Sequence, residues 1–423
     1  MGLFRRNKNN DRPLFRQIID LIPRYLIKKS VDRYEADKHC SRYLTYDQLV
    51  SQMFGQLNKC YTLEDISAGL GVSLTFIGDL GLSQSPARST MSDGNKKRDW
   101  RVFEHLYLGL LRHYRGVLKA KHLPDKVIRD IENKTVRVID STTVSLCLPL
   151  FDWARFRTAK GGVKIHTCLD SETMLPDVVN ITEAKVHDSK GLAQQVFKKG
   201  DIIVEDRAYY EFALMKARIE AGNDFVTRIK DNACYEVVAI RPLPEDAPEG
   251  VIADVEIHLT GAKAVESGMA GYALRMVTVY DAEKGKTLEL ITNNFDWKAE
   301  TVGALYRHRW SVEVFFKTLK QNLQVKTFTG TSPNAVKSQI YIALICYLLL
   351  ELLRRNTCRV GHAFSNFTER VRICLNYYLS LDYVCNNICQ GAKRVDKRKP
   401  PDLFSGQSDN RTSKTNTLRL TFT

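Results

Sequence analysis

Two aspartates in this 423-residue sequence follow runs of apolar residues that are typical of β-strands. Asp140 closes the run VRVID (136–140), and Asp206 closes the run DIIVED (201–206). In open α/β sheets, ligands gather at the carboxyl ends of strands, and neighbouring strands lie about 5 Å apart. The sequence therefore predicts that the two carboxylates meet at one edge of a sheet, where they can share a metal ion.

Other acids compete with this interpretation. Asp170 also ends a predicted strand, but the residues that follow it, Ser-Glu-Thr, predict the tip of a hairpin. Glu205 precedes Asp206, and the alternation of side chains along a strand places it on the opposite face. An aspartate at a strand end more often stabilises a turn than binds a ligand. Each aspartate alone is therefore weak evidence for a metal site.

A third acid, Glu313, lies in the stretch YRHRWSVEVFFKTLKQNL (306–323), which is predicted to be helical. At 100° per residue, one narrow face within about 80° holds five polar residues, namely Tyr306, Arg309, Glu313, Lys317 and Lys320. An apolar stripe beside this face predicts that the helix packs on the sheet. The simpler interpretation makes Glu313 an i,i+4 ion-pair partner of Arg309 or Lys317. The sharper one places a carboxylate at a cleft, with cations around it for phosphate groups.

The overall charge favours a polyanionic partner. The chain holds 63 Lys and Arg against 48 Asp and Glu, a formal net charge of +15, which favours nucleic acid over an anionic membrane surface. The ten cysteines form no C-x-x-C pair and are interpreted as free thiols in a reducing cytoplasm. The longest apolar run, 340–350, has 11 residues and is too short to span a bilayer. We therefore expect a cytoplasmic protein with a buried helix at this run and no membrane partner.

Residues 1–130 are predicted to form a helical DNA-binding domain. Two helix signals, 62–71 with Thr62 as N-cap and 85–100 with Ser85 as N-cap, surround a glycine turn and predict a helix-turn-helix. The second helix is expected to expose several polar side chains to DNA, among them Arg88, Ser89, Ser92, Asn95 and Lys96. The alternative is a plain helical bundle with a polar surface.

Residues 131–390 are predicted to form a mixed α/β domain. Hairpin-linked strands up to residue 184 are followed by a helix from about Asp188, a strand at 201–206, a helix at 209–222 and a strand at 224–230. A β-rich insertion is expected at about 231–290, before helices at 298–325, 335–355 and 366–380. The tail, 391–423, has eight Lys and Arg against three Asp and is predicted to be disordered.

The spacing Tyr306-x2-Arg309-x3-Glu313-x6-Lys320 matches the YREK signature of DDE transposases of the insertion sequence 4 family. The run ITNNFDWKAETVGALYRHRWSVEVFFK also resembles that family throughout. The sequence Asp206-Arg207-Ala208-Tyr209 is similar to the family's DRGY-like motif, except that Ala208 stands where glycine is usual. The resemblance covers about 135–355 well and the N-terminal helices loosely.

This resemblance implies a ribonuclease-H-like mixed sheet with a β-rich insertion, preceded by an all-α N-terminal region. It implies that Asp140, Asp206 and Glu313 are the catalytic triad and hold two Mg²⁺ ions, for which Mn²⁺ can substitute. Residues expected to contact DNA are Tyr306, Arg309, Lys320, Lys317, Lys164, His166 and Arg207, in addition to Arg88, Asn95 and Lys96 of the N-terminal region. Lys164 and His166 share one face of a predicted strand near the cleft.

The resemblance further implies a cut-and-paste transposase, which cleaves DNA at the ends of a mobile element and transfers the strands into target DNA. Its partners would be the terminal inverted repeats, the target DNA and a second copy of the chain or more, on the bacterial nucleoid. Two other functions stay open. One is an inactive, transposase-derived DNA-binding regulator, and the other is a ribonuclease-H-like nuclease without strand transfer.

Overall fold

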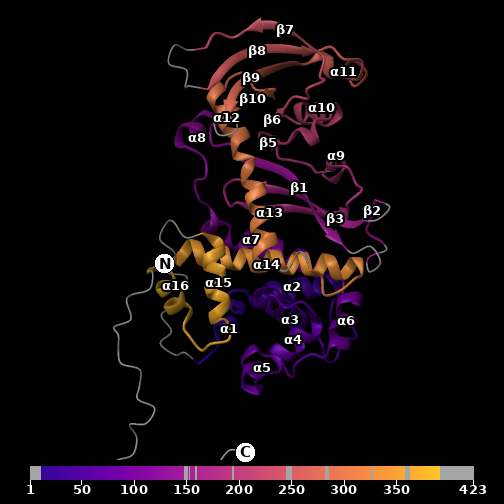
Figure 1. Cartoon of the computed structure of the whole chain (residues 1–423), viewed down its shortest axis with the longest axis vertical. Coiled ribbons are helices and arrows are strands. Elements are labelled where there is room, and N and C mark those ends of the chain that lie inside the picture. The colour runs from indigo at the N-terminus through magenta and orange to yellow at the C-terminus, as the bar shows by residue number, and fades with distance from the viewer. Residues whose placement is uncertain are drawn as a thin grey trace, which may run out of the picture.

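The computed structural model describes residues 11–146, 151, 153–157, 160–192, 195–243, 250–281, 285–323, 325, 327–357 and 363–390. The predicted disordered tail, 391–423, lies outside the described residues. The long helix α14 (Pro333–Thr357) crosses the middle of the molecule, with the N-terminal helices on one side of it and the sheet on the other (Figure 1).

Ten strands form one sheet. The path through it runs β2-β3-β1-β5-β6-β10-β9-β8-β7, and β4 also pairs with β3. The strands are β1 (Val136–Leu146), β2 (Arg155–Arg157), β3 (Lys160–Asp170), β4 (Leu175–Glu183), β5 (Ile202–Glu205), β6 (Asp224–Arg228), β7 (Tyr235–Ile240), β8 (Val251–Leu259), β9 (Ala273–Asp281) and β10 (Lys286–Thr292).

The first half of the sheet has the arrangement of a ribonuclease-H-like fold. The strands β4, β3 and β1 pair antiparallel in succession, and β1, β5 and β6 pair parallel. The connection from β5 to β6 carries the helix α10 (Phe212–Glu220), as a parallel pair requires. Between β4 and β5 lies the short helix α9 (Asp188–Gly191), which is shorter than the helix predicted there.

The β-rich segment does not stand apart from the sheet. Its last strand, β10, pairs antiparallel with β6 at Leu290↔Arg228, so β7 to β10 extend the catalytic sheet. They enclose a second, smaller apolar core together with α10, the helix α11 (Ala262–Glu266) and the turn η3 (Met269–Gly271). The prediction of β-structure here is confirmed, but the segment continues the same sheet rather than forming a separate layer.

Eight helices precede the sheet, namely α1 (Leu14–Ile19), α2 (Arg24–Tyr34), α3 (Thr45–Asn58), α4 (Leu63–Leu70), α5 (Leu74–Leu80), α6 (Arg88–Lys97), α7 (Arg101–Leu118) and α8 (Asp125–Asp130). Thr62 caps α4 as predicted, since its side chain accepts a hydrogen bond from the backbone of Asp65. The two-helix arrangement, however, is wrong. The helix α5, capped by Ser73, intervenes, and α6 begins at Arg88 rather than after Ser85.

The predicted helix 298–325 is divided at Arg309 into α12 (Ala299–His308) and α13 (Trp310–Asn322). After α13 come α14, α15 (Phe364–Cys374) and α16 (Leu381–Gln390). By composition, Pro333–Asn356 could cross a membrane, but 94% of its apolar window is buried inside the protein. The predicted buried helix at 340–350 is therefore confirmed as the centre of α14.

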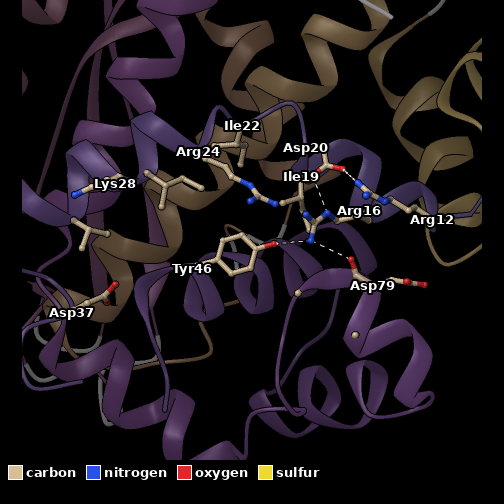
Figure 2. A pocket seen from close by; sticks show the side chains of 14 residues that line it. Arg12, Arg16, Ile19, Asp20, Ile22, Arg24, Lys28, Asp37, Tyr46 and Asp79 are labelled. Carbon is tan, nitrogen blue, oxygen red and sulfur yellow. Dashed lines mark hydrogen bonds and ion pairs between the residues drawn. The ribbon is translucent and has the colours of Figure 1, made fainter. Parts of the chain in front are cut away.

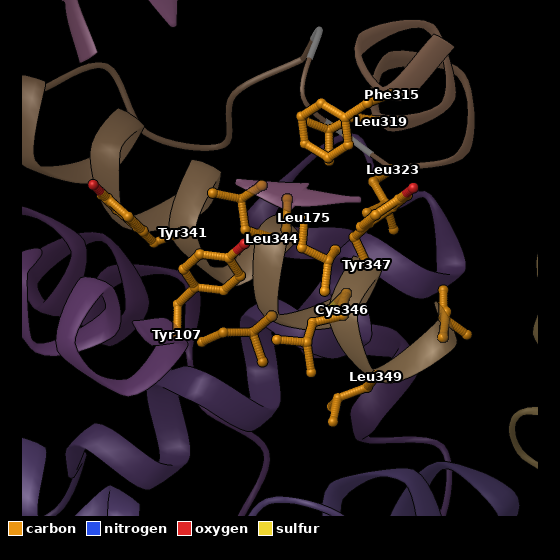
Figure 3. Close-up of a cluster of buried hydrophobic side chains, with 14 of the residues drawn as sticks. Tyr107, Leu175, Phe315, Leu319, Leu323, Tyr341, Leu344, Cys346, Tyr347 and Leu349 are labelled. Atoms are coloured by element: carbon orange, nitrogen blue, oxygen red, sulfur yellow. The ribbon is translucent and has the colours of Figure 1, made fainter. Parts of the chain in front are cut away.

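Figure 3 shows the core around α14, where Phe315 and Leu319 of α13 lie on one side of Leu344 and Tyr347. Tyr107 of α7 lies on the other side, and its hydroxyl donates to the carbonyl oxygen of Pro176 in β4 at 2.7 Å. One apolar cluster thus joins the N-terminal helices, the sheet and the helix that carries Glu313.

Candidate active site

The register of the parallel pair brings the two strand-end aspartates side by side. The last paired residues of β1 and β5 are Ile139 and Glu205, and each is followed by an aspartate. Asp140 accepts a hydrogen bond from the backbone N–H of Ser141 at 2.7 Å, and Asp206 accepts one from that of Arg207 at 2.7 Å. These bonds hold both carboxylates at the carboxyl edge of the sheet, as predicted.

The competing acids are accounted for elsewhere. Glu205 is fully buried on the other face and forms an ion pair with Arg218 of α10. Asp170 is also fully buried, and its carboxylate lies 2.5 Å from the guanidinium of Arg115 in α7. Both carboxylates are therefore committed to structural ion pairs.

Arg309 joins the third acid to this edge. Its guanidinium lies 3.3 Å from Oδ2 of Asp140 and 2.7 Å from Oε1 of Glu313. Tyr306, one turn earlier at the end of α12, donates from its hydroxyl to Oδ1 of Asp206 at 3.4 Å. The break between α12 and α13 thus lies directly over the ends of β1 and β5. The simple ion pair expected for Glu313 is present, and it is part of a larger cluster.

The electrostatics of the cluster tie the three carboxylates together. Burial raises the pKa of Asp140 to about 6, and the charges of Asp206 and Glu313 add to this rise, while the Ser141 N–H and Arg309 oppose it. Burial alone would lower the pKa of Arg309, but Asp206, Glu313 and Asp140 together raise it. Three carboxylates therefore surround one guanidinium, and the site carries excess negative charge.

The donor set fits a hard divalent cation. All three side chains offer carboxylate oxygens, which Mg²⁺ prefers, and they cluster around a positive charge. Within the described part of the chain, no three acidic, histidine or cysteine groups stand close enough together to hold an ion. Arg309 lies between Asp140 and Glu313 and accounts for their separation. The site fits metal if this guanidinium moves aside.

Further cations flank the cluster. Lys320 donates from Nζ to Oγ1 of Thr142 at 2.5 Å and to the carbonyl oxygen of Thr143 at 2.9 Å, so it lies beside the end of β1. Lys317 is exposed on the same helix. Trp310, which sequence analysis did not single out, is 50% exposed next to Arg309.

On the other side of the cluster, a hollow of about 670 Å³ opens beside Asp206. Three of its lining residues are basic, namely Arg207, Arg228 and Lys230. Arg207 forms an ion pair with Asp231 at 2.6 Å. Arg207 therefore lies at the surface beside the acids, as expected of a residue that contacts DNA.

Of the two residues predicted on β3, only Lys164 lies near the acids. Its Nζ is 3.1 Å from Oδ1 of Asp188, which also accepts a hydrogen bond from Ser141. His166 is fully buried, packs against Gly191 and has its Nε2 3.0 Å from Oγ1 of Thr182. The prediction that His166 faces the cleft is wrong, because α9 covers this part of β3.

In the N-terminal region, Arg88 and Lys96 of α6 are exposed. Asn95 is only 4% exposed, and its side-chain oxygen accepts a hydrogen bond from Gln48 of α3 at 2.8 Å. Asn334 of α14 donates to the backbone oxygen of Asn95 at 2.9 Å. The expectation that Asn95 faces DNA is therefore wrong, because this face of α6 packs on α3 and α14.

A separate pocket of about 690 Å³ lies in the N-terminal region, away from the acids, and Figure 2 shows its lining. Arg16 crosses it and donates to Asp20 at 2.8 Å and to the Tyr46 hydroxyl at 3.3 Å. Its basic side chains are mixed with Asp20, Asp37 and Asp79, so the pocket shows no excess of charge comparable to that of the acid cluster.

Sequence reasoning missed Asp188 and the role of Ser141. Asp188 looked like an ordinary acid in the first turn of a helix. The available signal for Ser141 was its place directly after Asp140, where its backbone N–H and its hydroxyl point to different acids.

The sheet order and the Asp–Asp–Glu cluster at its edge define a ribonuclease-H-like enzyme. Residues 132–349 match the family described as the transposase DDE domain, and residues 10–81 match a domain of unknown function. The chain belongs to the DDE transposase family and is a DNA-cleaving transposase of the insertion sequence 4 type. Proteins of this family generally use divalent metal ions.

Relatives support this assignment. The chain is 33% identical over 311 residues to a probable transposase for insertion sequence element IS5377 of Geobacillus stearothermophilus, across 67% of this chain and 80% of that protein. It is 32% identical over 293 residues to a putative transposase of Sinorhizobium fredii, across 69% of this chain and 78% of that protein.

Transposase InsG for insertion sequence element IS4 of Escherichia coli is 27% identical over 173 residues, across 38% of this chain and 37% of that protein. A solved structure of the piggyBac transposase synaptic complex with hairpin DNA has a TM-score of 0.36 and 12% identity, over 90% of this chain and 85% of that chain. At that score the similarity does not by itself establish a shared fold.

Proposed function

We propose that this protein is a cut-and-paste transposase that cleaves DNA at the ends of a mobile element and transfers the strands into target DNA. The observation that carries the proposal is the gathering of Asp140, Asp206 and Glu313 around the guanidinium of Arg309. Such a cluster suits metal-assisted phosphoryl transfer, because three carboxylates with one competing cation leave negative charge for metal ions to neutralise.

In this proposal, the three carboxylates hold two Mg²⁺ ions, which Mn²⁺ can replace. When bound, the ions supply an activated oxygen nucleophile and stabilise the leaving oxygen. Arg309 gives up its contacts with Asp140 and Glu313 and turns to the phosphate, where its planar donors can bind two oxygens. Lys320 holds the strand beside Thr142, and Tyr306 donates a hydrogen bond to a phosphate oxygen.

The basic residues on both sides of the acids give the DNA strand a path across the site. Lys317 and Lys320 lie on the side of α13, and Arg207 lies on the side of the hollow next to Asp206. Lys164 contacts the strand from β3. The exposed Arg88 and Lys96 of α6 contact the terminal inverted repeats. Two or more copies of the chain assemble on the paired ends in the cytoplasm, at the bacterial nucleoid.

A strand-transfer assay tests the proposal. Full-length protein is mixed with a duplex that carries the inverted repeat found beside its gene and with a supercoiled target plasmid, in Mg²⁺, in Mn²⁺ or in EDTA. Metal-dependent cleavage at the repeat boundary followed by joining to the plasmid supports it. Cleavage without joining would identify a nuclease, and binding without cleavage an inactive regulator.

A further inference from the structure

We infer that Asp188 is a positioning residue for the acid cluster: it orients the Asp140–Ser141 turn and keeps Lys164 away from Asp140. The inference rests on the proposed function, since it assigns Asp188 to the support of the same metal site. It is independent of the three acids of the family signature, because Asp188 lies between β4 and β5 and outside that pattern.

The carboxylate of Asp188 is the meeting point of two strands. Its Oδ1 accepts a hydrogen bond from the hydroxyl of Ser141, which follows the end of β1's buried half. The same oxygen lies 3.1 Å from Nζ of Lys164 on the adjacent strand β3. Lys164 also donates to the carbonyl oxygen of Val186 at 2.9 Å, so its ammonium group is held at α9.

Ser141 connects this carboxylate to the proposed metal ligand. Its backbone N–H donates to Oδ1 of Asp140 at 2.7 Å, while its side chain donates to Asp188. Any change in the Ser141 hydroxyl contact therefore acts on the peptide that orients Asp140. Buried Tyr209, three residues after Asp206, lies close enough that both Asp140 and Asp188 raise its pKa, in addition to the larger effect of burial.

Asp188 is not needed to cap its own helix. The N-cap of α9 is His187, whose side chain accepts from the backbone of Ser189. The helix has only four residues. With 24% of its side chain exposed, Asp188 is half-buried at the site rather than part of the apolar core. A supporting role for Asp140 and Lys164 is thus the role that its contacts describe.

Groups that orient metal ligands are typically worth about 10–100-fold in metal affinity or activity. In Asp188→Asn, the amide can still accept from Ser141, but the negative charge opposite Lys164 is lost. The ammonium group is then free to approach Asp140 and to compete with the metal ion. In Ser141→Ala, the charge stays and the turn loses its anchor. Both variants should weaken metal binding by different routes.

The experiment measures Mn²⁺ binding to the full-length protein by electron paramagnetic resonance of the free ion, with thermal unfolding in parallel. We expect Asp188→Asn and Ser141→Ala each to raise the apparent Kd for Mn²⁺ about 10–100-fold, with little change in Tm. The control is Glu183→Gln, because Glu183 ends β4 and pairs with Lys185 at the surface, 2.6 Å apart. This control should bind Mn²⁺ as the unsubstituted protein does.

An unchanged Kd in both variants would overturn the inference, and so would a fall in Tm with an unchanged Kd. Asp140→Ala separates this result from failure of the proposed function. If Asp140→Ala loses Mn²⁺ and Asp188→Asn does not, only the role of Asp188 is wrong. If Asp140→Ala binds Mn²⁺ as the unsubstituted protein does, the proposed metal site itself is wrong.

Discussion

Nη1 of Arg309 lies 3.3 Å from Oδ2 of Asp140, so a residue at the break between two helices contacts the end of the first core strand. The same guanidinium bonds Glu313 at 2.7 Å. Without metal, Arg309 thus supplies the positive charge that three clustered acids require. Metal ions and Arg309 must then compete for the same carboxylates.

This competition predicts the behaviour of Arg309→Ala. Without metal, the variant should be destabilised by about 2 kcal/mol, less than the roughly 3–5 kcal/mol for breaking a fully buried pair. Added Mg²⁺ should raise the Tm of the variant more than that of the unsubstituted protein. Cleavage should fall about 10²–10³-fold, because the developing phosphate charge is left unneutralised. Equal Mg²⁺-induced Tm shifts in both proteins would contradict the prediction.

Asp140→Ala and Asp206→Ala should each abolish cleavage and leave DNA binding intact or stronger. Each change removes a metal ligand and also one negative charge from the face that contacts phosphate. Nicking of a pre-bound end duplex in Mg²⁺, together with a gel-shift titration, checks both parts. Nicking near the rate of the unsubstituted protein in either variant would mean that the acid is no ligand.

Glu313→Gln distinguishes a metal ligand from a helix ion pair. A ligand that loses its charge should cost several orders of magnitude in cleavage while the Tm hardly moves. An ion-pair partner alone should cost at most about 0.5 kcal/mol of stability and leave activity in place. Glu369→Gln is the control, since Glu369 pairs with Arg372 on α15 in an i,i+3 ion pair. Full activity of Glu313→Gln would remove the proposed mechanism.

On α6, exposed and buried polar residues should behave differently. Arg88→Ala and Lys96→Ala should each weaken binding to end DNA and reduce the salt dependence of the affinity by about one ion. Asn95→Ala should instead lower the Tm, because it leaves the buried amide of Gln48 without its acceptor. Loss of DNA affinity in Asn95→Ala at unchanged Tm would restore its predicted role in base reading.

His166 should influence acid stability rather than DNA binding. Burial lowers the pKa of His166 to about 4, below the value of about 6.5 for an unfolded chain. Protonation therefore favours the unfolded state, and stability is lost as pH falls through 6.5 towards 4. From pH 7 to pH 5 the loss is about 2 kcal/mol.

Thermal unfolding of His166→Gln across this pH range checks the prediction. The glutamine variant cannot take up this proton, so its stability relative to the unsubstituted protein should improve steadily as pH falls. A pH-independent difference between the two proteins would show that His166 is not the titrating group. Weaker DNA binding at pH 7 with an unchanged Tm would return His166 to the DNA interface.

Much of the catalytic edge was predictable because it depends on local patterns. Apolar strands ending at Asp140 and Asp206 gave the two acids, and the period of the 306–323 helix gave the face of Glu313. Glu205 was excluded by alternation along β5 alone, and its buried ion pair with Arg218 confirms that exclusion.

What failed depends on contacts between distant segments. Asn95 is buried by Gln48, 47 residues earlier, and by Asn334 of α14. The pairing of β10 with β6 joins residues about 60 positions apart and leaves no local trace. The break at Arg309 was hidden because its backbone is nearly helical, with φ −51° and ψ −33°.

The long helix α14 also limits how this chain can be rearranged. Its residues pack with Tyr107 of α7 on one side and Phe315 of α13 on the other, in one continuous cluster. The N-terminal helices are therefore not an interchangeable module. A chimaera that takes residues 11–130 from another transposase must also inherit a matching surface on α14, or both halves will unfold together. Such elements should diversify their end recognition by substitution on α6 rather than by exchange of whole segments.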